Sequence, residues 1–476
     1  MYDVTVIGGG VVGGLILRKL SSYDLKICLL EKSSDVCMGQ SKANSGIVHA
    51  GFDAKEGTLK AKFNVLGNKM MKKTAEELGV KYINNGSLVV AFSEYDLKTL
   101  EELKIRGEKN GVGELEIIDG ETLKSIEPNI SDNVVGALYA KTGGIVCPYE
   151  LTIAAIGNAM DNGADLKLDF NVVKIEKNGG IFCIFSDNSE RVETKIIINC
   201  AGIGSEKIAN LVGDYSFKIG GRKGEYILLD RESGNFVNHT LFFTPTEKGK
   251  GILVSGTVDG NLLLGPTAEE VGNDDVSTSS EGLSVIMKKA SEMCKNVPFY
   301  NTITSFAGVR AYCDKHDFII EKSKAADNFI NCVGIESPGL TSAPAIAEYV
   351  AEELVSDMIK LTKKACFNPV RRADCFFRNL SDEEKNAVIE KDRSFGHIVC
   401  RCEKVTEGEI IAAVRNNPPA LTVDAVKRRT RAGMGRCQGG FCQPSVAEII
   451  SRETGIPFDK ITKCGKGSEL LVGKTK

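Results

Sequence analysis

A glycine-rich segment near the N-terminus constrains the fold of this chain more than any other feature. Residues 8–13 read Gly-Gly-Gly-Val-Val-Gly, which satisfies the pattern G-x-G-x-x-G, and they follow an apolar stretch, Tyr2 to Ile7, that predicts a buried strand. The spacing predicts a tight turn at Gly8, a close approach of a pyrophosphate at Gly10, and tight packing of the next helix at Gly13. The sequence therefore predicts a strand, a nucleotide-binding turn and a helix at the start of the chain.

An acidic residue completes this predicted nucleotide site. Glu31 follows a second apolar stretch, residues 25–30, and lies 18 residues beyond Gly13. A carboxylate in this place can accept hydrogen bonds from ribose hydroxyls. The motif alone does not distinguish FAD from NAD. Its candidate nucleotide-binding residues are Gly8, Gly9, Gly10, Gly13, Glu31 and Lys32.

Length and charge narrow the class of protein. With 476 residues, the chain is long enough for about three domains of ~150 residues. Its 60 Lys and Arg nearly balance 63 Asp and Glu, and this balance gives no indication of nucleic acid as a partner. The chain starts with a predicted strand and not with a signal peptide, and its most apolar stretch is too short and glycine-rich to span a bilayer. We therefore expect a cytoplasmic protein with no transmembrane segment.

Four separated segments indicate which nucleotide is bound. Residues 40–51, 172–173, 196–202 and 334–342 occur in the order and sequence context of the FAD-dependent superfamily of D-amino-acid oxidase and glycerol-3-phosphate dehydrogenase, which residues 1–362 resemble. The resemblance implies that the last segment opens a helix whose N-terminal dipole stabilises negative charge on reduced flavin. It also implies further FAD contacts at Ser41, Asn44, Ser45, Gly46, Val173, Ala201, Gly202, Gly334, Gly339, Leu340 and Thr341.

The substrate side carries a weaker signal. Arg310 ends the segment 305–310, which resembles a family segment whose arginine faces the flavin, and a guanidinium there would bind a carboxylate or phosphate. The alternative is a surface ion pair. Oxidation of an alcohol also needs a base for the hydroxyl proton, and the candidates are His49, His239 and His316. An amine substrate would not strictly need such a base.

Four cysteines near the C-terminus form the sharpest pattern. Cys400 and Cys402 are followed, after 34 residues, by Cys437 and Cys442. Four thiolates can hold zinc or an iron–sulfur cluster, but a C-x-C pair fits zinc knuckles poorly. Residues 427–442 closely resemble the bacterioferritin-associated-ferredoxin-like (BFD-like) [2Fe-2S] domain, a module fused to anaerobic glycerol-3-phosphate dehydrogenases and to opine and amino-acid dehydrogenases.

A basic run lies just before the second cysteine pair. Residues 427–431 contain four Lys or Arg, and residues 400–476 together carry 14 Lys or Arg against 8 Asp or Glu, a local charge of +6. This charge stabilises a negative cluster, docks an acidic redox partner, or belongs to a solvated helix face. The sequence leaves these alternatives open.

Together these features predict an α/β fold with three domains. We expect a discontinuous Rossmann-like FAD-binding domain, an α+β substrate-binding domain, a linker at 363–395 and a small helical [2Fe-2S] domain at 396–476. The FAD-binding domain comprises residues 1–75, 150–214 and 316–362, and the substrate-binding domain comprises residues 76–149 and 215–315.

The expected function is that of an FAD-dependent dehydrogenase for a small anionic alcohol. The leading substrate that the resemblance implies is glycerol 3-phosphate, oxidised to dihydroxyacetone phosphate. The resemblance also implies that electrons leave through the cluster to a second flavoprotein or iron–sulfur subunit, through which the enzyme would be peripheral to a membrane. Alternatives are a 2-hydroxy acid such as 2-hydroxyglutarate, or an amine or opine. A different class also stays open: a redox docking or sensing module with a vestigial flavin site.

Overall fold

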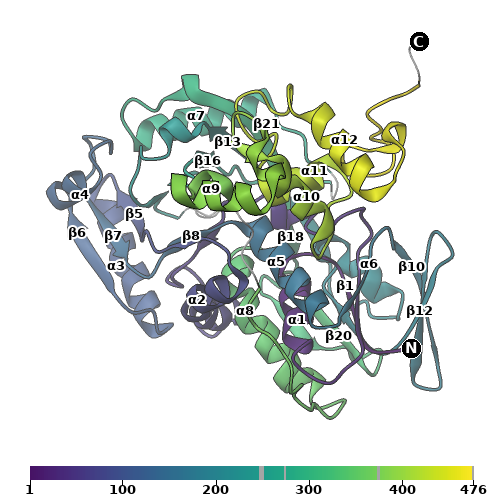
Figure 1. Ribbon diagram of the computed structural model, residues 1–476. Helices are drawn as coiled ribbons and strands as arrows, with labels where there is room; N and C mark the ends of the chain where they lie inside the picture. Colours follow the sequence, from purple (N-terminus) through teal and green to yellow (C-terminus); the bar gives the residue numbers. More distant parts are fainter. Residues whose placement is uncertain (246–250, 273–274, 372–375, 474–476) are drawn as a thin grey trace.

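The strand, turn and helix predicted at the N-terminus are present in the computed structural model, which describes residues 1–245, 251–272, 275–371 and 376–473 (Figure 1). β1 spans Tyr2–Ile7, α1 spans Val11–Leu20 and β2 spans Ile27–Leu30. The expected mixed α/β fold is confirmed: two large sheets, covering helices and a small helical C-terminal region make up the chain.

The first sheet has eight strands and a parallel centre. Val4 of β1 pairs with Ile196 on one side and with Ile27 on the other. The buried residues at the centre of these strands are mostly apolar, as expected where both faces of a parallel sheet are covered. The remaining strands are β9 (Asp165–Lys167), β10 (Val172–Asn178), β11 (Ile181–Ser186), β12 (Arg191–Asn199), β19 (Ile319–Lys322) and β20 (Phe329–Val333).

The parallel strands β1, β2, β12 and β20 place functional segments at one edge. The residues directly after them are Gly8, Glu31, Cys200 and Gly334. Ligands bind outside the carboxyl ends of parallel strands in open α/β sheets. The helices α1, α5 (Pro148–Asp161) and α8 (Gly339–Tyr349, continued by a π-helical segment, Val350–Val355) pack on this sheet through one apolar core.

The second sheet has nine strands and surrounds a long antiparallel pair. β13 (Ile219–Leu229) and β18 (Thr302–Cys313) pair along their length, with Arg222 directly opposite Arg310. The other strands are β5 (Ser87–Ala91), β6 (Leu115–Asp119), β7 (Gly136–Ala140), β14 (Thr240–Phe243), β15 (Leu253–Gly256), β16 (Leu262–Gly265) and β17 (Glu269–Val271). We propose that the two sheets are the centres of the two larger predicted domains.

Smaller elements complete this part of the molecule. A three-stranded sheet of β3 (Ile47–Val48), β8 (Gly144–Val146) and β4 (Tyr82–Ile83) orders the segment 40–51. The helices are α2 (Leu59–Leu78), α3 (Glu94–Lys109), α4 (Gly120–Ile126), α6 (Ser205–Asn210) and α7 (Ser280–Met293). Among the helices of the described ranges, none combines the length and apolar character that crossing a bilayer requires.

The C-terminal region has its own core. Ile410, Val426 and Ile450 are buried together between its helices. The elements are β21 (Ile398–Cys400), β22 (Val405–Thr406), α10 (Glu407–Arg415), α11 (Val423–Thr430) and α12 (Gln443–Thr454). The predicted linker contains a further helix, α9 (Asp382–Lys391). In Figure 1 this region, in light green and yellow, lies on one side of the molecule, where α11 contacts α5.

The basic run 427–431 holds this region against the rest of the chain. Arg428 and Arg429 are buried and both bind Asp35, on the loop after β2. Arg431 is also buried and pairs with Glu403 and Asp259. The interpretation of this run as a solvated helix face, which the sequence left open, is therefore wrong for these three arginines, because each forms an ion pair with a carboxylate inside the molecule.

Candidate functional site

A cavity of about 1710 Å³ lies where the parallel strands of the first sheet end and the β13–β18 pair begins. This volume exceeds the ~300–1,000 Å³ of a typical small-ligand pocket, so it has room for a dinucleotide and a small substrate. Most of the candidate cofactor residues line it: Gly8, Gly9, Gly10, Glu31, Lys32, Ser41, Asn44, Ser45, Ala201, Gly202, Gly339 and Leu340.

The glycines at the turn after β1 are required by close backbone contacts. Gly8 has a φ of 113°, and a Cβ there would lie 2.4 Å from the carbonyl oxygen of Cys200. A Cβ on Gly13 would lie 2.1 Å from the Gly8 oxygen, so Gly13 supports the turn from behind without lining the cavity. The N-terminus of α1 consequently reaches the cavity, where its N–H groups suit a pyrophosphate.

Glu31 shapes the loop beside this turn. Its two carboxylate oxygens accept hydrogen bonds from the backbone N–H groups of Gly9, at 2.8 Å, and Ser33, at 2.9 Å. Ser41 adds an Oγ that accepts from the Val11 N–H at 3.0 Å. These bonds fix the donors and acceptors that face the cavity.

Asn44 and Thr341 organise the segment 40–51. The Asn44 amide donates to the carbonyl oxygens of Gln40 and Ser41, and its Oδ1 accepts from the Gly46 N–H at 2.9 Å. Thr341 Oγ1 accepts from the His49 N–H at 2.9 Å and ties this segment to α8. Gly46, Gly334 and Thr341 do not line the cavity themselves and so act through the backbone they support.

At the strand β10 the structure differs from the sequence-based choice. Val172 lines the cavity, whereas the side chain of Val173 is 41% exposed and does not. Adjacent residues of a strand point to opposite faces, so only one of the two can present its side chain to the cofactor.

Arg310 lies in the cavity wall and not on the surface. Its Nη2 donates to the Thr267 carbonyl oxygen at 2.8 Å, and its buried Nε has no hydrogen-bond partner within the described residues. No carboxylate of the described ranges forms an ion pair with it, which speaks against the surface ion pair. A half-buried guanidinium whose buried Nε is an unused donor fits an anionic substrate group.

Of the three candidate histidines, His49 lines the cavity. Its Nε2 lies 3.3 Å from Ser337 Oγ, which also lines the cavity. His239 is held elsewhere by buried Glu127, with Nδ1 2.7 Å from its Oε1, and by Tyr139. His316 contacts the hydroxyl of Tyr312. Neither His239 nor His316 lines the cavity, so neither is placed to meet a substrate there.

Sequence reasoning missed several residues that build this site. Gln40 donates to the Ile335 oxygen and accepts from the Ala311 N–H, and so joins the turn before α8 to β18. Tyr226 stacks on Phe306 with ring centroids 4.8 Å apart. Gln40 and Phe306 lie inside recognised segments, and this was the available signal: Gln40 opens the segment 40–51, and Phe306 belongs to 305–310.

The four C-terminal cysteines come together in two pairs. Cys402 Sγ and Cys437 Sγ lie 3.7 Å apart. Two thiolates bound tetrahedrally to one metal ion at ~2.3 Å would be about 3.8 Å apart, so this spacing fits. In the other pair, a hydrogen bond from Cys442, together with the backbone N–H groups of Gly433 and Glu403, outweighs burial and lowers the pKa of Cys400 to about 6.

In the Cys402–Cys437 pair, backbone donors favour the thiolate of Cys437. Burial alone would raise the pKa of Cys437, but N–H groups of Phe441 and Gly439 outweigh burial and lower it. Gly435 leaves room for Cys402, because a Cβ at that position would lie 2.4 Å from the Cys402 Cβ. Two pairs of thiols with backbone donors match the needs of a cluster with two irons and a negative charge.

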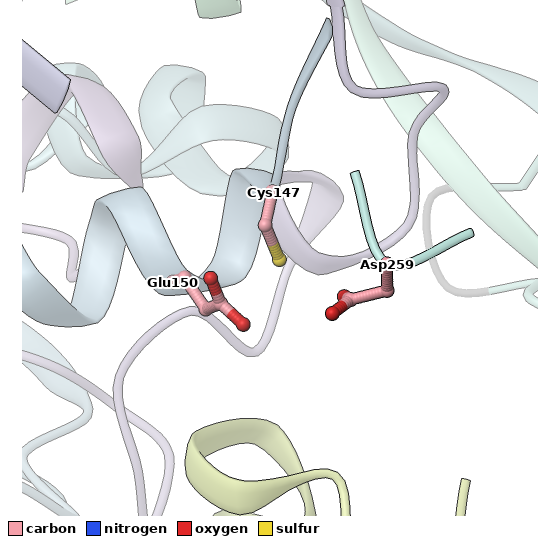
Figure 2. A group of neighbouring side chains, drawn as sticks. All are labelled: Cys147, Glu150 and Asp259. Atoms are coloured by element: carbon pink, nitrogen blue, oxygen red, sulfur yellow. The ribbon is translucent and has the colours of Figure 1, made fainter. Parts of the chain in front are cut away.

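A third group of possible ligands lies between the two sites. Figure 2 shows Cys147, Glu150 and Asp259 pointing toward one another, with ligand atoms within 4.8 Å. However, the two oxygens of Asp259 accept hydrogen bonds from Arg378 and Arg431, at 2.8 and 2.7 Å. Burial raises the pKa of Cys147 well above that of an ordinary thiol. We assign the group to the domain contact and not to a metal ion.

Comparison with known proteins identifies the class. The family model for FAD dependent oxidoreductases matches residues 3–353, and the model for BFD-like [2Fe-2S] binding domains matches residues 398–452. The chain therefore belongs to the FAD-dependent oxidoreductase family and carries a [2Fe-2S] domain. Its cofactors are FAD and a [2Fe-2S] cluster. Since it is an FAD-dependent oxidoreductase, the alternative of a module with a vestigial flavin site is wrong.

Particular enzymes of this class are also similar to the chain. The chain is 50% identical to a glycerol 3-phosphate dehydrogenase of Caloramator mitchellensis, covering all of this chain and 99% of the relative. It is 30% identical to an L-2-hydroxyglutarate dehydrogenase of Escherichia coli O17:K52:H18 over 56% of this chain and 64% of that protein. A solved L-alpha-glycerophosphate oxidase from Mycoplasma pneumoniae with FAD bound is 31% identical, with a TM-score of 0.74, over 78% of this chain and 98% of its own.

Proposed function

We propose that this enzyme oxidises glycerol 3-phosphate to dihydroxyacetone phosphate and delivers the electrons through its cluster to a partner protein. The observation that carries the proposal is the cavity at Arg310: a half-buried guanidinium, whose buried Nε has no hydrogen-bond partner within the described residues, lines the same cavity as His49 and the candidate flavin loop. Identity of 50% to a glycerol 3-phosphate dehydrogenase along the whole chain supports the choice of substrate.

In this proposal each residue of the cavity has a separate role. Arg310 would bind the anionic phosphate and fix the substrate, so that its reacting carbon meets the cofactor in one orientation. His49, near Ser337, would take the hydroxyl proton at Nε2 as the carbon loses hydride. Bound FAD supplies the two-electron acceptor, and the cluster supplies one-electron transfer. The walls of Tyr226 and Phe306 would limit access of water.

The cluster domain supports a dehydrogenase over an oxidase. The glycerophosphate oxidase matches only 78% of this chain although nearly all of its own length is covered, and residues 398–452 belong to a separate family model. An enzyme that gives its electrons to oxygen needs no such domain. A second flavoprotein or iron–sulfur subunit as acceptor, and any membrane association through it, are part of this proposal.

The second candidate is a 2-hydroxy acid. L-2-hydroxyglutarate also offers an anion for Arg310 and a hydroxyl for His49, and the relative from Escherichia coli matches over 56% of the chain. An amine or opine substrate comes third, because such chemistry would leave His49 without a required role.

Anaerobic titration of the holoenzyme separates these candidates. We expect glycerol 3-phosphate to bleach the flavin absorbance and then to produce the EPR signal of the reduced cluster. Glycerol, which lacks the phosphate, should not bleach the flavin at the same concentration. Bleaching by L-2-hydroxyglutarate without bleaching by glycerol 3-phosphate would overturn the proposal.

A further inference from the structure

The cluster site has a buried side and an exposed side. Cys400 and Cys442 are only 2% and 4% exposed, whereas Cys402 is exposed and Cys437 is half-buried. The two ligands on the exposed side are the pair whose sulfurs lie 3.7 Å apart. A cluster held by these four thiols therefore presents one edge, at Cys402 and Cys437, to its surroundings.

A large aromatic residue stands at this edge. Phe441 is 87% exposed, although it lies between the two ligands Cys437 and Cys442 and its backbone N–H donates to Cys437. A phenylalanine ring in water loses the free energy that burial would give it, and aromatic residues are enriched in the centres of protein interfaces. No residue in the described ranges stacks on this ring.

The charges around the edge are positive and uncompensated. Arg401 and Lys404 are exposed, lie within two residues of Cys402, and form no ion pair with a described residue. The buried Glu403 between them points to Arg378 and Arg431 instead. Arg436, also exposed, is already paired with Asp230 and Glu232, so it adds no free positive charge.

This pattern contrasts with the rest of the basic residues of the domain. Arg428, Arg429 and Arg431 form ion pairs with carboxylates inside the molecule and hold the domain in place. At Arg401 and Lys404, positive charge that is left for another molecule stands beside the exposed cluster ligands. We call Arg401, Cys402, Lys404, Gln438 and Phe441 the Phe441 surface.

We propose that the Phe441 surface docks an acidic one-electron carrier protein. The proposal rests on the proposed function and names the chemistry of its electron acceptor. Each docking event would pass one electron from the reduced cluster to the oxidised carrier, with no bond made or broken, so two events would remove the two electrons that one substrate molecule gives up. Phe441 would fill the centre of the contact, while Arg401 and Lys404 steer the acidic partner.

Two carriers of opposite charge test the proposal. The full-length holoenzyme is reduced anaerobically and mixed in a stopped-flow instrument with plastocyanin, an acidic blue-copper protein, or with cytochrome c, which is basic. We expect plastocyanin to oxidise the cluster faster than cytochrome c does at low salt. This difference in rate should vanish near 1 M salt, where the Debye length is only ~3 Å. The double variant Arg401→Glu/Lys404→Glu should slow plastocyanin at least tenfold and accelerate cytochrome c.

Matched variants identify the surface. Lys460→Glu/Lys466→Glu changes the same charge at exposed positions of the same domain and should leave both rates unchanged. Phe441→Ser should slow plastocyanin at every salt concentration while the EPR signal of the cluster stays normal. Equal effects of the two double variants would overturn the proposal. If a variant loses its cluster, the wild-type salt dependence decides: a rate with plastocyanin that does not fall as salt rises refutes docking here.

The outcome is independent of the substrate. Reduction by dithionite loads the cluster even if glycerol 3-phosphate fails to bleach the flavin, so failure of the proposed function and failure of the docking surface give different results. Reduction of the flavin by substrate should be the same in all three variants, because none of the altered residues lines the cavity.

Discussion

Replacement of Asp35 by Asn tests how the cluster domain is held. The Asp35 carboxylate is 1% exposed and binds two arginines of α11: Arg428 Nη2 at 2.5 Å and Arg429 Nη1 and Nη2 at 3.0 and 2.9 Å. Asn keeps the shape but removes the negative charge, which leaves two buried guanidinium groups uncompensated. Removal of one partner of a buried ion pair typically costs ~3–5 kcal/mol, and here one carboxylate serves two cations.

The assay is urea unfolding of the FAD- and cluster-loaded protein. We expect Asp35→Asn to lower the free energy of the first unfolding transition by about 3–5 kcal/mol and to release the C-terminal domain to proteolysis before the rest unfolds. Asp132→Asn is the matched control, because Asp132 forms an exposed ion pair with Lys295 and its loss should leave the transition unchanged. An equally small change in both variants would refute the buried network as the means of docking.

The pH dependence of this difference follows from the same contacts. Burial alone would raise the pKa of Asp35, but Arg429 and Arg428 outweigh it and hold the pKa below the usual 3.8. A carboxyl group whose pKa is lower in the folded state stabilises the fold above its unfolded pKa and loses that contribution as the pH falls through the folded pKa. The difference between wild type and Asp35→Asn should therefore stay constant from pH 7 to 5 and narrow only below about pH 3.8.

Three further variants test the two redox sites. Arg310→Ala should raise the substrate concentration for half-maximal flavin reduction about 10- to 100-fold without loss of FAD, since a charged hydrogen bond is worth ~1.5–3 kcal/mol; unchanged kinetics would remove Arg310 from the site. His49→Gln should slow flavin reduction by about 10²–10⁴, and an unchanged rate would mean another base. Cys437→Ser should abolish the EPR signal of the cluster yet preserve bleaching of the flavin by substrate, and loss of both would mean that the cluster is needed for folding.

The features that could be predicted from the sequence depend on short-range spacing. The turn at residues 8–13 needs glycine at fixed spacings, because its backbone lies close to the neighbouring strand and to the following helix. This requirement leaves a recognisable pattern in the sequence. The four cysteines are likewise brought together by two loops of fixed spacing. The two cofactors were therefore predictable, and so was the α/β fold that follows from the strand–turn–helix start.

The features that could not be predicted depend on which distant segment a side chain meets. The sequence favours His49, because it lies in the segment 40–51, but does not exclude His239 or His316. Glu127 and Tyr139 hold His239 outside the cavity, and only the tertiary structure shows this. Asp35 gave no signal either, because its partners are almost 400 residues away. The sequence did not show whether Val172 or Val173 faces the cavity. Successive residues of a strand point to opposite faces, so a shift of one residue changes which side chain lies there.

The same limit explains why total charge was a poor guide to the C-terminal domain. Its excess of +6 is divided between arginines that the chain neutralises internally and residues that remain available to another molecule. Arg428 and Arg429 bind Asp35, and the loop that carries Asp35 also meets the nucleotide turn, since the Cys37 N–H donates to the Gly9 oxygen at 2.8 Å. A displacement of the domain would therefore disturb the loop beside the FAD site. This coupling favours a cluster domain that stays docked while electrons pass, with only its outer edge left to meet the acceptor.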